Sequence, residues 1–233
     1  RTTVGHAPGS WWGFIADGVF QTNEEAANYV NKNGERLQPQ AIAGDLKFRD
    51  FNNDGKIDNS DMSDLGSPYP KFSSGLALTL AYGNFDFRTE LYGVFGQQNF
   101  NQYRRNMIAG SNYNFISGFQ DQYWHGPGTS NSFPELRKTD LNGNFTKMST
   151  FFLEKSNFLR ANLMQLGYKL PNGLIKGIKN LRVYVSAQNL FTISNYSGLN
   201  PDIPWYSTIS YAGNDNYQMV PPRIYTFGLN LAL

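Results

Sequence analysis

The feature that most constrains this chain is a set of long segments in which apolar and polar residues alternate with a period of two. Such alternation puts apolar side chains on one face of a β-strand and small or polar side chains on the other. Residues 72–82 are the first strong case, with Phe, Leu and Tyr sharing one face. The pattern returns in residues 85–95, 158–170, 181–191 and 225–233. We therefore predict an all-β chain.

The length of these segments separates two kinds of β protein. Each runs for about ten to twelve residues, whereas strands in soluble domains most often have about 5–6. Tilted transmembrane strands need about 9–11 residues, so strand length favours a transmembrane β-barrel. Within 158–170 the apolar set changes phase at Leu163 and Met164, which predicts a β-bulge there.

The connections between these segments alternate in length. Gly83-Asn84 is a two-residue hairpin signal, and residues 171–180 form a second short connection. Residues 97–157 and 192–222 are long and rich in polar residues. Transmembrane barrels have short periplasmic turns and long extracellular loops. The alternation of short and long connections therefore favours a transmembrane barrel, because a soluble β-sandwich has no reason to maintain it.

The composition supports the same class and excludes others. Aromatic residues make up 15% and charged residues only 16%, against about a quarter charged in soluble domains. A formal net charge of +2 argues against nucleic acid as a partner. The absence of Cys and the presence of only two His argue against disulfides, thiolate chemistry and a His-based site. No apolar run approaches a transmembrane helix, and no signal-peptide core follows Arg1, which we interpret as an internal start.

Residues 50–61 carry the sharpest chemical motif, with the sequence DFNNDGKIDNSD. It follows the EF-hand loop pattern, in which oxygens at positions 1, 3 and 5 converge on one hard cation and a Gly at position 6 allows a sharp turn. Lys56 would offer its backbone carbonyl, Asp58 would act through water, and Asp61 stands where Glu is usual. The predicted metal ligands are Asp50, Asn52, Asp54, Lys56, Asp58 and Asp61.

We expect Ca²⁺ at this loop, in preference to Mg²⁺, because the ligands are many, all oxygen, and carried by a flexible segment. No helical pattern flanks residues 50–61, so the role is structural rather than that of a sensor. The ion would stabilise a loop that lacks a hydrophobic core of its own. The alternative is a turn rich in Asp and Asn that binds no metal.

Five segments carry motifs that recur in a fixed order along the chain, namely 12–22, 50–72, 158–171, 183–202 and the last strand. Together these segments resemble the SusC family of TonB-dependent importers of the Bacteroidetes. Two departures are Asn200, where an acidic residue is common, and Leu233, where an aromatic residue more often ends the chain. The resemblance covers nearly the whole chain, so we treat residues 1–233 as one domain, the C-terminal part of the barrel.

The resemblance implies a 22-stranded antiparallel barrel with long extracellular loops, in the bacterial outer membrane. It implies a partner lipoprotein of the SusD type, TonB acting through an N-terminal region outside this chain, and import of oligosaccharides or oligopeptides. It also allows a dimer of the transporter–lipoprotein pair. In this family the C-terminus is periplasmic, so counting back along the strands makes the loop at 50–61 extracellular. No enzymatic activity is expected.

Two other classes share some of these features. A secreted Ca²⁺-binding β-sandwich, acting in glycan binding or adhesion, would also carry an acidic loop and alternating strands. A β-rich glycosidase would need two carboxylates facing a cleft, and no pair is distinguished for that role. We interpret the alternating Asp86, Arg88 and Glu90 as a polar wall of the barrel lumen rather than a catalytic cluster. The sequence does not identify the residues that contact the transported ligand.

Overall fold

The computed structural model describes residues 1–109, 117–172, 175, 177–203 and 212–232. Parts of three of the four predicted connections (97–157, 171–180 and 192–222), and the terminal Leu233, therefore lie outside the described residues. The chain divides into two compact units, which we describe separately. The sheet unit comprises Pro70–Gln97, Lys155–Asp202 and Gln218–Leu233, and the loop unit comprises Arg1–Tyr69, Gln98–Glu154 and Ile203–Tyr217.

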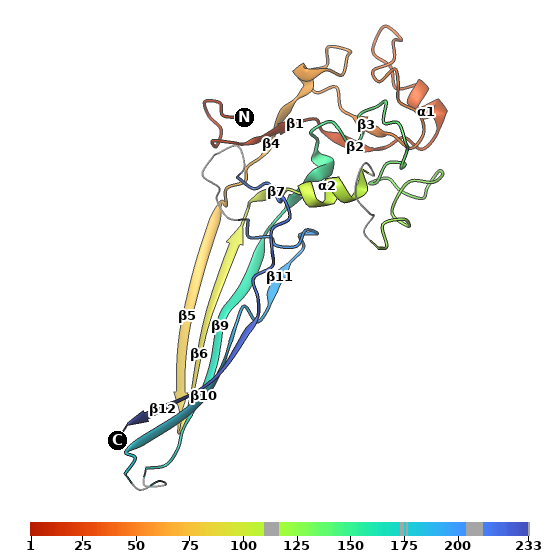
Figure 1. Cartoon of the computed structure of the whole chain (residues 1–233). Coiled ribbons are helices and arrows are strands. Elements are labelled where there is room, and N and C mark those ends of the chain that lie inside the picture. Colours follow the sequence, from red (N-terminus) through yellow and green to blue (C-terminus); the bar gives the residue numbers. More distant parts are fainter. Residues whose placement is uncertain (110–116, 173–174, 176, 204–211, 233) are drawn as a thin grey trace. The chain divides into compact units, whose positions relative to one another are not determined.

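The sheet unit is built on long antiparallel strands, which form the extended ribbon of arrows in Figure 1. The strands are neighbours in the order β12-β10-β9-β6-β5, and the short β11 also pairs with β9. Five of them have 9 to 12 residues, as the alternation predicted. Their bounds are β5 Phe72–Tyr82, β6 Phe85–Phe95, β9 Phe158–Lys169, β10 Asn180–Gln188, β11 Thr192–Ser194 and β12 Ile224–Ala232.

The hairpin between β5 and β6 lies where its sequence signal predicted. The two strands pair without interruption from Phe72 opposite Phe95 to Tyr82 opposite Phe85. Gly83 has a φ of +58°, a left-handed conformation that the two-residue hairpin turns require and that glycine adopts without a steric penalty. The turn chemistry therefore fixes the register of the longest hairpin in the chain.

The predicted β-bulge is present in β9. On β6, Glu90 lies opposite Leu163, but the next residue, Leu91, lies opposite Ala161. Asn162 is thus the extra residue, one position away from the predicted site. The bulge lets the apolar side chains before and after it stay on the same face of the sheet, which explains the change of phase in the sequence.

The loop unit consists of short elements joined by turns. Its strands pair two by two, β1 with β4, β2 with β3 and β7 with β8. No helix among the described residues of the chain is long and apolar enough to cross a membrane. The elements are β1 Trp11–Gly13, β2 Ala16–Val19, α1 Asn23–Ala27, β3 Leu46–Phe48, η1 Asn59–Asp61, β4 Ser63–Gly66, β7 Gln98–Phe100, α2 Gln102–Ile108, η2 Thr150–Phe152 and β8 Leu153–Lys155.

Buried hydrophobic clusters lie within the loop unit. Phe14, Val19, Leu46 and Phe48 form one of them, and Ile57 of the acidic loop packs against it together with Met62. A second cluster brings together Phe100, Ile108, Tyr123, Phe145 and Phe152. These residues come from segments far apart in sequence, so no local pattern predicts the clusters.

Candidate functional site

One face of the long sheet is polar. Residues opposite each other on neighbouring strands point to the same side, so the register defines rows across the sheet. One row contains Thr79, Arg88, Gln165, Ser186 and Thr226. The sequence prediction that Asp86, Arg88 and Glu90 share one face agrees with this arrangement.

The polar face is held by ion pairs between its own strands. Arg182 on β10 donates from Nε to Asp86 Oδ1 on β6 at 2.8 Å, across the intervening β9. Gly167 of β9 makes this possible, because a Cβ at that position would lie 2.3 Å from Arg182 Nη2 and 2.5 Å from Asp86 Oδ1. Arg88 pairs with Glu90 along β6. The charged groups are therefore paired with one another, as a polar wall requires.

The opposite face is apolar and exposed. One of its rows contains Leu80, Phe87, Leu166, Val185 and Phe227, which lie opposite one another across five strands. Phe227 is 81% exposed and Leu80 is 53% exposed. Soluble proteins rarely expose contiguous apolar patches of this extent. The face therefore needs an apolar environment to cover it.

Aromatic side chains mark both ends of this apolar face. At the end formed by the hairpin turn, the rings of Phe85 and Tyr168 lie 4.7 Å apart between centroids, next to Tyr82. At the other end, the rings of Phe72 and Phe95 stack at 6.2 Å. An apolar band bounded by aromatic residues is typical of the lipid-facing surface of an outer-membrane barrel.

The acidic loop lies in the loop unit, between β3 and β4, and its carboxylates bind the loop's own backbone. Asp50 Oδ2 accepts from Gly55 N at 2.9 Å, and Asp54 Oδ1 accepts from Lys56 N at 3.0 Å. Gly55 adopts a φ of +88°, as the EF-hand pattern requires at its sixth position. Hydrogen bonds from the Ser60 hydroxyl and backbone lower the pKa of Asp58. Asp and Asn side chains therefore stabilise the turn by accepting hydrogen bonds from its backbone N–H groups.

Asp61, the last predicted ligand, is fully buried, and both of its carboxylate oxygens accept hydrogen bonds from backbone N–H groups. Its Oδ1 accepts from Phe51 N at 2.8 Å and its Oδ2 from Asp58 N at 2.8 Å. With Asp58 it forms a capping box around η1. Because the Asp side chain is short, it lies against the backbone of the loop rather than reaching across it as a Glu could.

Two of the other predicted ligands, Asp50 and Asp54, help to line a cavity of about 400 Å³, whereas Asn52, Lys56 and Asp58 are not among its lining residues. Among the described residues, Asp50 Oδ1 is buried and has no hydrogen-bond partner. Asn52 Oδ1 accepts from Asp54 N, and Asn52 Nδ2 donates to Asp54 Oδ2. Within the described part of the chain, no three His, Cys, Asp or Glu side chains are grouped so that they could hold a metal ion.

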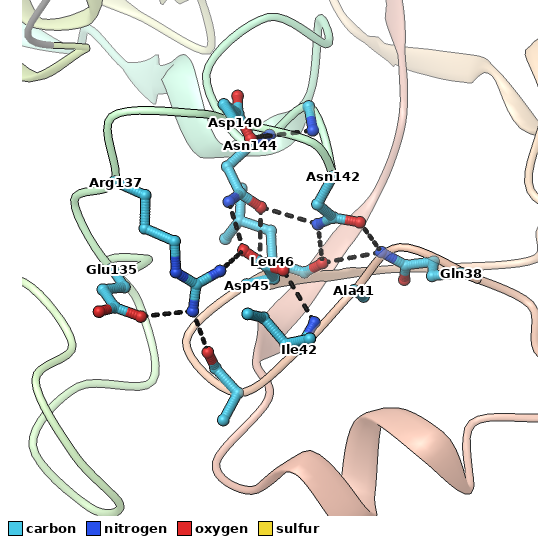
Figure 2. A network of polar contacts seen from close by, with 12 residues as sticks. Gln38, Ala41, Ile42, Asp45, Leu46, Glu135, Arg137, Asp140, Asn142 and Asn144 are labelled. Atoms are coloured by element: carbon cyan, nitrogen blue, oxygen red, sulfur yellow. Dashed lines mark hydrogen bonds and ion pairs between the residues drawn. The ribbon is translucent and has the colours of Figure 1, made fainter.

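A buried polar network holds the loop unit together, and sequence reasoning missed it (Figure 2). Its centre is Asp45, which is 3% exposed and pairs with Arg137 Nη1 at 2.6 Å. Asn144 donates from Nδ2 to Asp45 Oδ1 at 2.8 Å and accepts from Leu46 N at 2.8 Å. Gln38 donates to Asn142 at 2.8 Å. The network joins segments about a hundred residues apart in sequence, so it fixes the course of the long connection.

Comparison with known proteins shows which proteins this chain resembles. No family model matches the chain. TonB-dependent receptor P3 of Formosa agariphila is 25% identical over 234 residues, covering 97% of this chain and 22% of the receptor. The solved structure of the RagAB peptide importer in the open-open state has a TM-score of 0.67 at 17% identity, covering 96% of this chain and 22% of that one. The chain thus resembles TonB-dependent receptors, which are outer-membrane proteins, and the predicted localisation is confirmed.

Within that class the resemblance is to the SusC type, as the sequence motifs predicted. TonB-dependent receptor SusC of Bacteroides thetaiotaomicron is 30% identical over 190 residues, covering 80% of this chain and 17% of the receptor. The likeness to RagAB is below 25% identity and shows the fold alone. The chain spans about a fifth of the length of these proteins. These relatives are named as receptors and importers, which is consistent with the prediction that the chain is not an enzyme.

Proposed function

We propose that this chain is a segment of the wall and outer loops of a barrel that imports nutrients across the outer membrane with energy from TonB. The observation that carries the proposal is the sheet with one polar and one exposed apolar face, continuous over five strands. A barrel wall needs this arrangement, with lipid on one side and an aqueous or protein-filled lumen on the other.

The height of the apolar face supports a membrane-spanning role. Phe72 and Tyr82, at opposite ends of β5, are ten residues apart, which is about 33 Å along a strand. With a strand tilt of about 40°, the height along the membrane normal is about 25 Å, the usual height of the apolar band in such barrels. A β-sandwich would cover this face with a second sheet, and the exposure of Phe227 and Leu229 argues against that class.

Both outer strands of the sheet also support a larger barrel. In the described residues, β5 pairs only with β6, and β12 pairs only with β10. Strands of a membrane barrel have hydrogen-bonded neighbours on both sides, because exposed backbone groups are costly in lipid. We infer that further strands of the full receptor pair with β5 and β12, in a barrel of 22 strands as the resemblance implies.

The transport partners are proposed from the relatives. SusC and the RagAB importer belong to the class that we expect to act with a surface lipoprotein of the SusD type and with TonB. The transported ligand is an oligopeptide or an oligosaccharide, and the solved structures are named as peptide importers. By the strand count, the hairpin turn at residues 83–84 is periplasmic and the acidic loop is extracellular. A dimer of the transporter–lipoprotein pair is compatible with this arrangement.

We further propose that the acidic loop binds Ca²⁺. The support is the free, buried Asp50 Oδ1 next to an open cavity, since a buried carboxylate oxygen without a partner is costly. Asp50, Asn52, Asp54 and the Lys56 carbonyl would supply oxygens, with Asp58 acting through water. Asp61 already accepts backbone hydrogen bonds at both of its carboxylate oxygens, so it is the least available of the predicted ligands. The cation would offset the repulsion between the carboxylates of this loop.

The import proposal is tested with the full-length receptor in its host. A strain that lacks the receptor should fail to take up the transported peptides or oligosaccharides, and the receptor gene should restore uptake only when TonB is present. The lipoprotein partner should co-purify with the receptor in detergent. Uptake that continues without TonB, or a receptor that is soluble and monomeric without detergent, would contradict the proposal.

A further inference from the structure

A cavity in the sheet unit combines two arginines with an apolar wall. It has a volume of about 250 Å³ and lies where β9, β11 and the segment before β12 meet. Among its lining residues, all of which the structure describes, none is acidic. The lining residues include Arg160, Thr192, Leu199, Val220, Pro221 and Arg223.

Arg160 is held rigidly at this cavity. It is 6% exposed, and it donates to Thr192 Oγ1 at 3.1 Å and to Asn200 Oδ1 at 3.0 Å. A third hydrogen bond, from Nη1 to Asp202 Oδ2, measures 2.9 Å. A guanidinium has five N–H donors, so two remain beyond these three bonds. Arg160 can therefore bind a further acceptor without losing the contacts that fix it.

Arg223 supplies a second cation at the same cavity. It is exposed, and it has no ion pair or hydrogen bond within the described residues. The segment that leads to it is fixed, since Asn189 Nδ2 donates to Pro222 O at 3.1 Å and Asn200 Nδ2 donates to Met219 O at 3.3 Å. With Asp202 paired to Arg160, the cavity carries about one uncompensated positive charge.

The cavity also lies on the polar face of the sheet. Arg160 is opposite Tyr92 on β6, and Tyr92 alternates in phase with Glu90 and Arg88 of the polar wall. If the sheet is a barrel wall, as proposed above, a ligand that passes through the lumen can reach this cavity. The inference that follows therefore rests on the proposed function.

We propose that this cavity binds a carboxylate group of the transported ligand. The planar fork of an arginine matches a carboxylate in geometry and charge, and a single uncompensated charge suits a monoanion. Leu199, Val220 and Pro221 offer apolar contacts beside the charge. The carboxylate can belong to the end of a peptide or to an acidic sugar, and both share this chemistry.

The test measures binding to the full-length receptor in detergent by calorimetry. Three probes distinguish the sources: an acetylated leucine tripeptide with a free C-terminal carboxylate, the same peptide with a C-terminal amide, and trigalacturonate. The free acid or trigalacturonate should bind at least about tenfold more tightly than the amide, which corresponds to one charge-assisted hydrogen bond. Which of the two binds identifies the source of the carboxylate.

The variant Arg223→Gln should weaken binding of the charged probe about tenfold and leave the amide unchanged. Lys179→Gln is the matched control, because Lys179 is an exposed cation outside the cavity and precedes β10. The proposal is overturned if no probe binds, if acid and amide bind equally, or if both variants have the same effect. TonB-dependent uptake by the unmodified receptor is measured separately, so a failure here leaves the import proposal standing.

Discussion

An arginine placed on the apolar face of β5 should destabilise the receptor, whereas an arginine next to it on the polar face should not. Leu78 lies on the apolar face, four residues from Tyr82 and six from Phe72. At about 3.3 Å per residue and a tilt of about 40°, it is about 10 Å from the level of Tyr82, near the middle of the 25 Å band. Arginine at this depth costs about 2–4 kcal/mol.

The matched control is Ala77→Arg, one residue away on the opposite face. Ala77 lies opposite Glu90 on β6, so its new cation would meet a carboxylate rather than lipid. A second comparison is Tyr82→Arg, at the edge of the band, where the cost should fall to about 0–1 kcal/mol.

The assay is reversible urea unfolding of the full-length receptor in phospholipid vesicles, followed by tryptophan fluorescence and by electrophoretic mobility without heating. We expect Leu78→Arg to lower the free energy of unfolding by about 2–4 kcal/mol and Ala77→Arg to lower it by less than about 1 kcal/mol. Equal costs at Leu78 and Ala77 would refute the assignment of the apolar face to lipid. A cost at Tyr82 as large as that at Leu78 would refute the placement of the band.

Three further predictions concern the loop unit. Removing Ca²⁺ with a chelator, or introducing Asp50→Ala, should increase protease cleavage within residues 44–66 and leave the membrane strands intact; unchanged cleavage would contradict the Ca²⁺ proposal. Burial raises the pKa of Tyr123 to about 12, so the stability that its neutral form contributes is fully present below the unfolded pKa of about 10 and should be lost as pH rises from about 10 to 12, by up to about 2–3 kcal/mol; Tyr123→Phe should reduce this alkaline fall in the melting temperature, and an unchanged fall would exclude Tyr123 as a source. Asp45→Ala should cost about 2–6 kcal/mol, because it removes the buried carboxylate that pairs with Arg137 and leaves the donors Asn144 Nδ2 and Ile42 N unsatisfied, at about 1–3 kcal/mol each, while Asp17→Ala, which breaks an exposed pair, should cost less than about 1 kcal/mol; comparable losses in thermal unfolding would show that the network is not stabilising.

Most bounds of the long strands could be predicted from the sequence to within about one residue, but β10 ends at Gln188, three residues before the predicted end at residue 191. The bounds of β5 and β6 are those of the alternating segments, because a two-residue turn and a period of two are local signals. Thr22 and Glu25 match a capping box, which predicts a helix over residues 23–30, and in the structure Thr22 Oγ1 accepts from Glu25 N at 3.0 Å at the start of α1. The helix ends at Ala27, earlier than the predicted Val30.

The loop unit could not be predicted in the same way. Asp45 and Asn144 meet across 99 positions of sequence, and short strands such as β1 and β3 have too few residues to show a period. The acidic loop is an intermediate case. Its turn and its Asx hydrogen bonds follow the motif, but the use of Asp61 as a backbone cap depends on the length of one side chain, which the motif does not specify.

The open edges of the long sheet bear on how the receptor assembles. In an antiparallel pair, about every second residue of a strand directs its N–H and C=O away from the partner. β5 has 11 residues and β12 has 9, so about ten residues on the two edges need partners outside the described sheet. Each unpaired backbone group in lipid costs several kcal/mol, and the sum exceeds the whole stability of an ordinary domain. If the sheet is part of a barrel wall, as proposed, insertion of these strands into the bilayer coincides with closure of the barrel, because a partly built wall would leave these backbone groups unpaired in lipid.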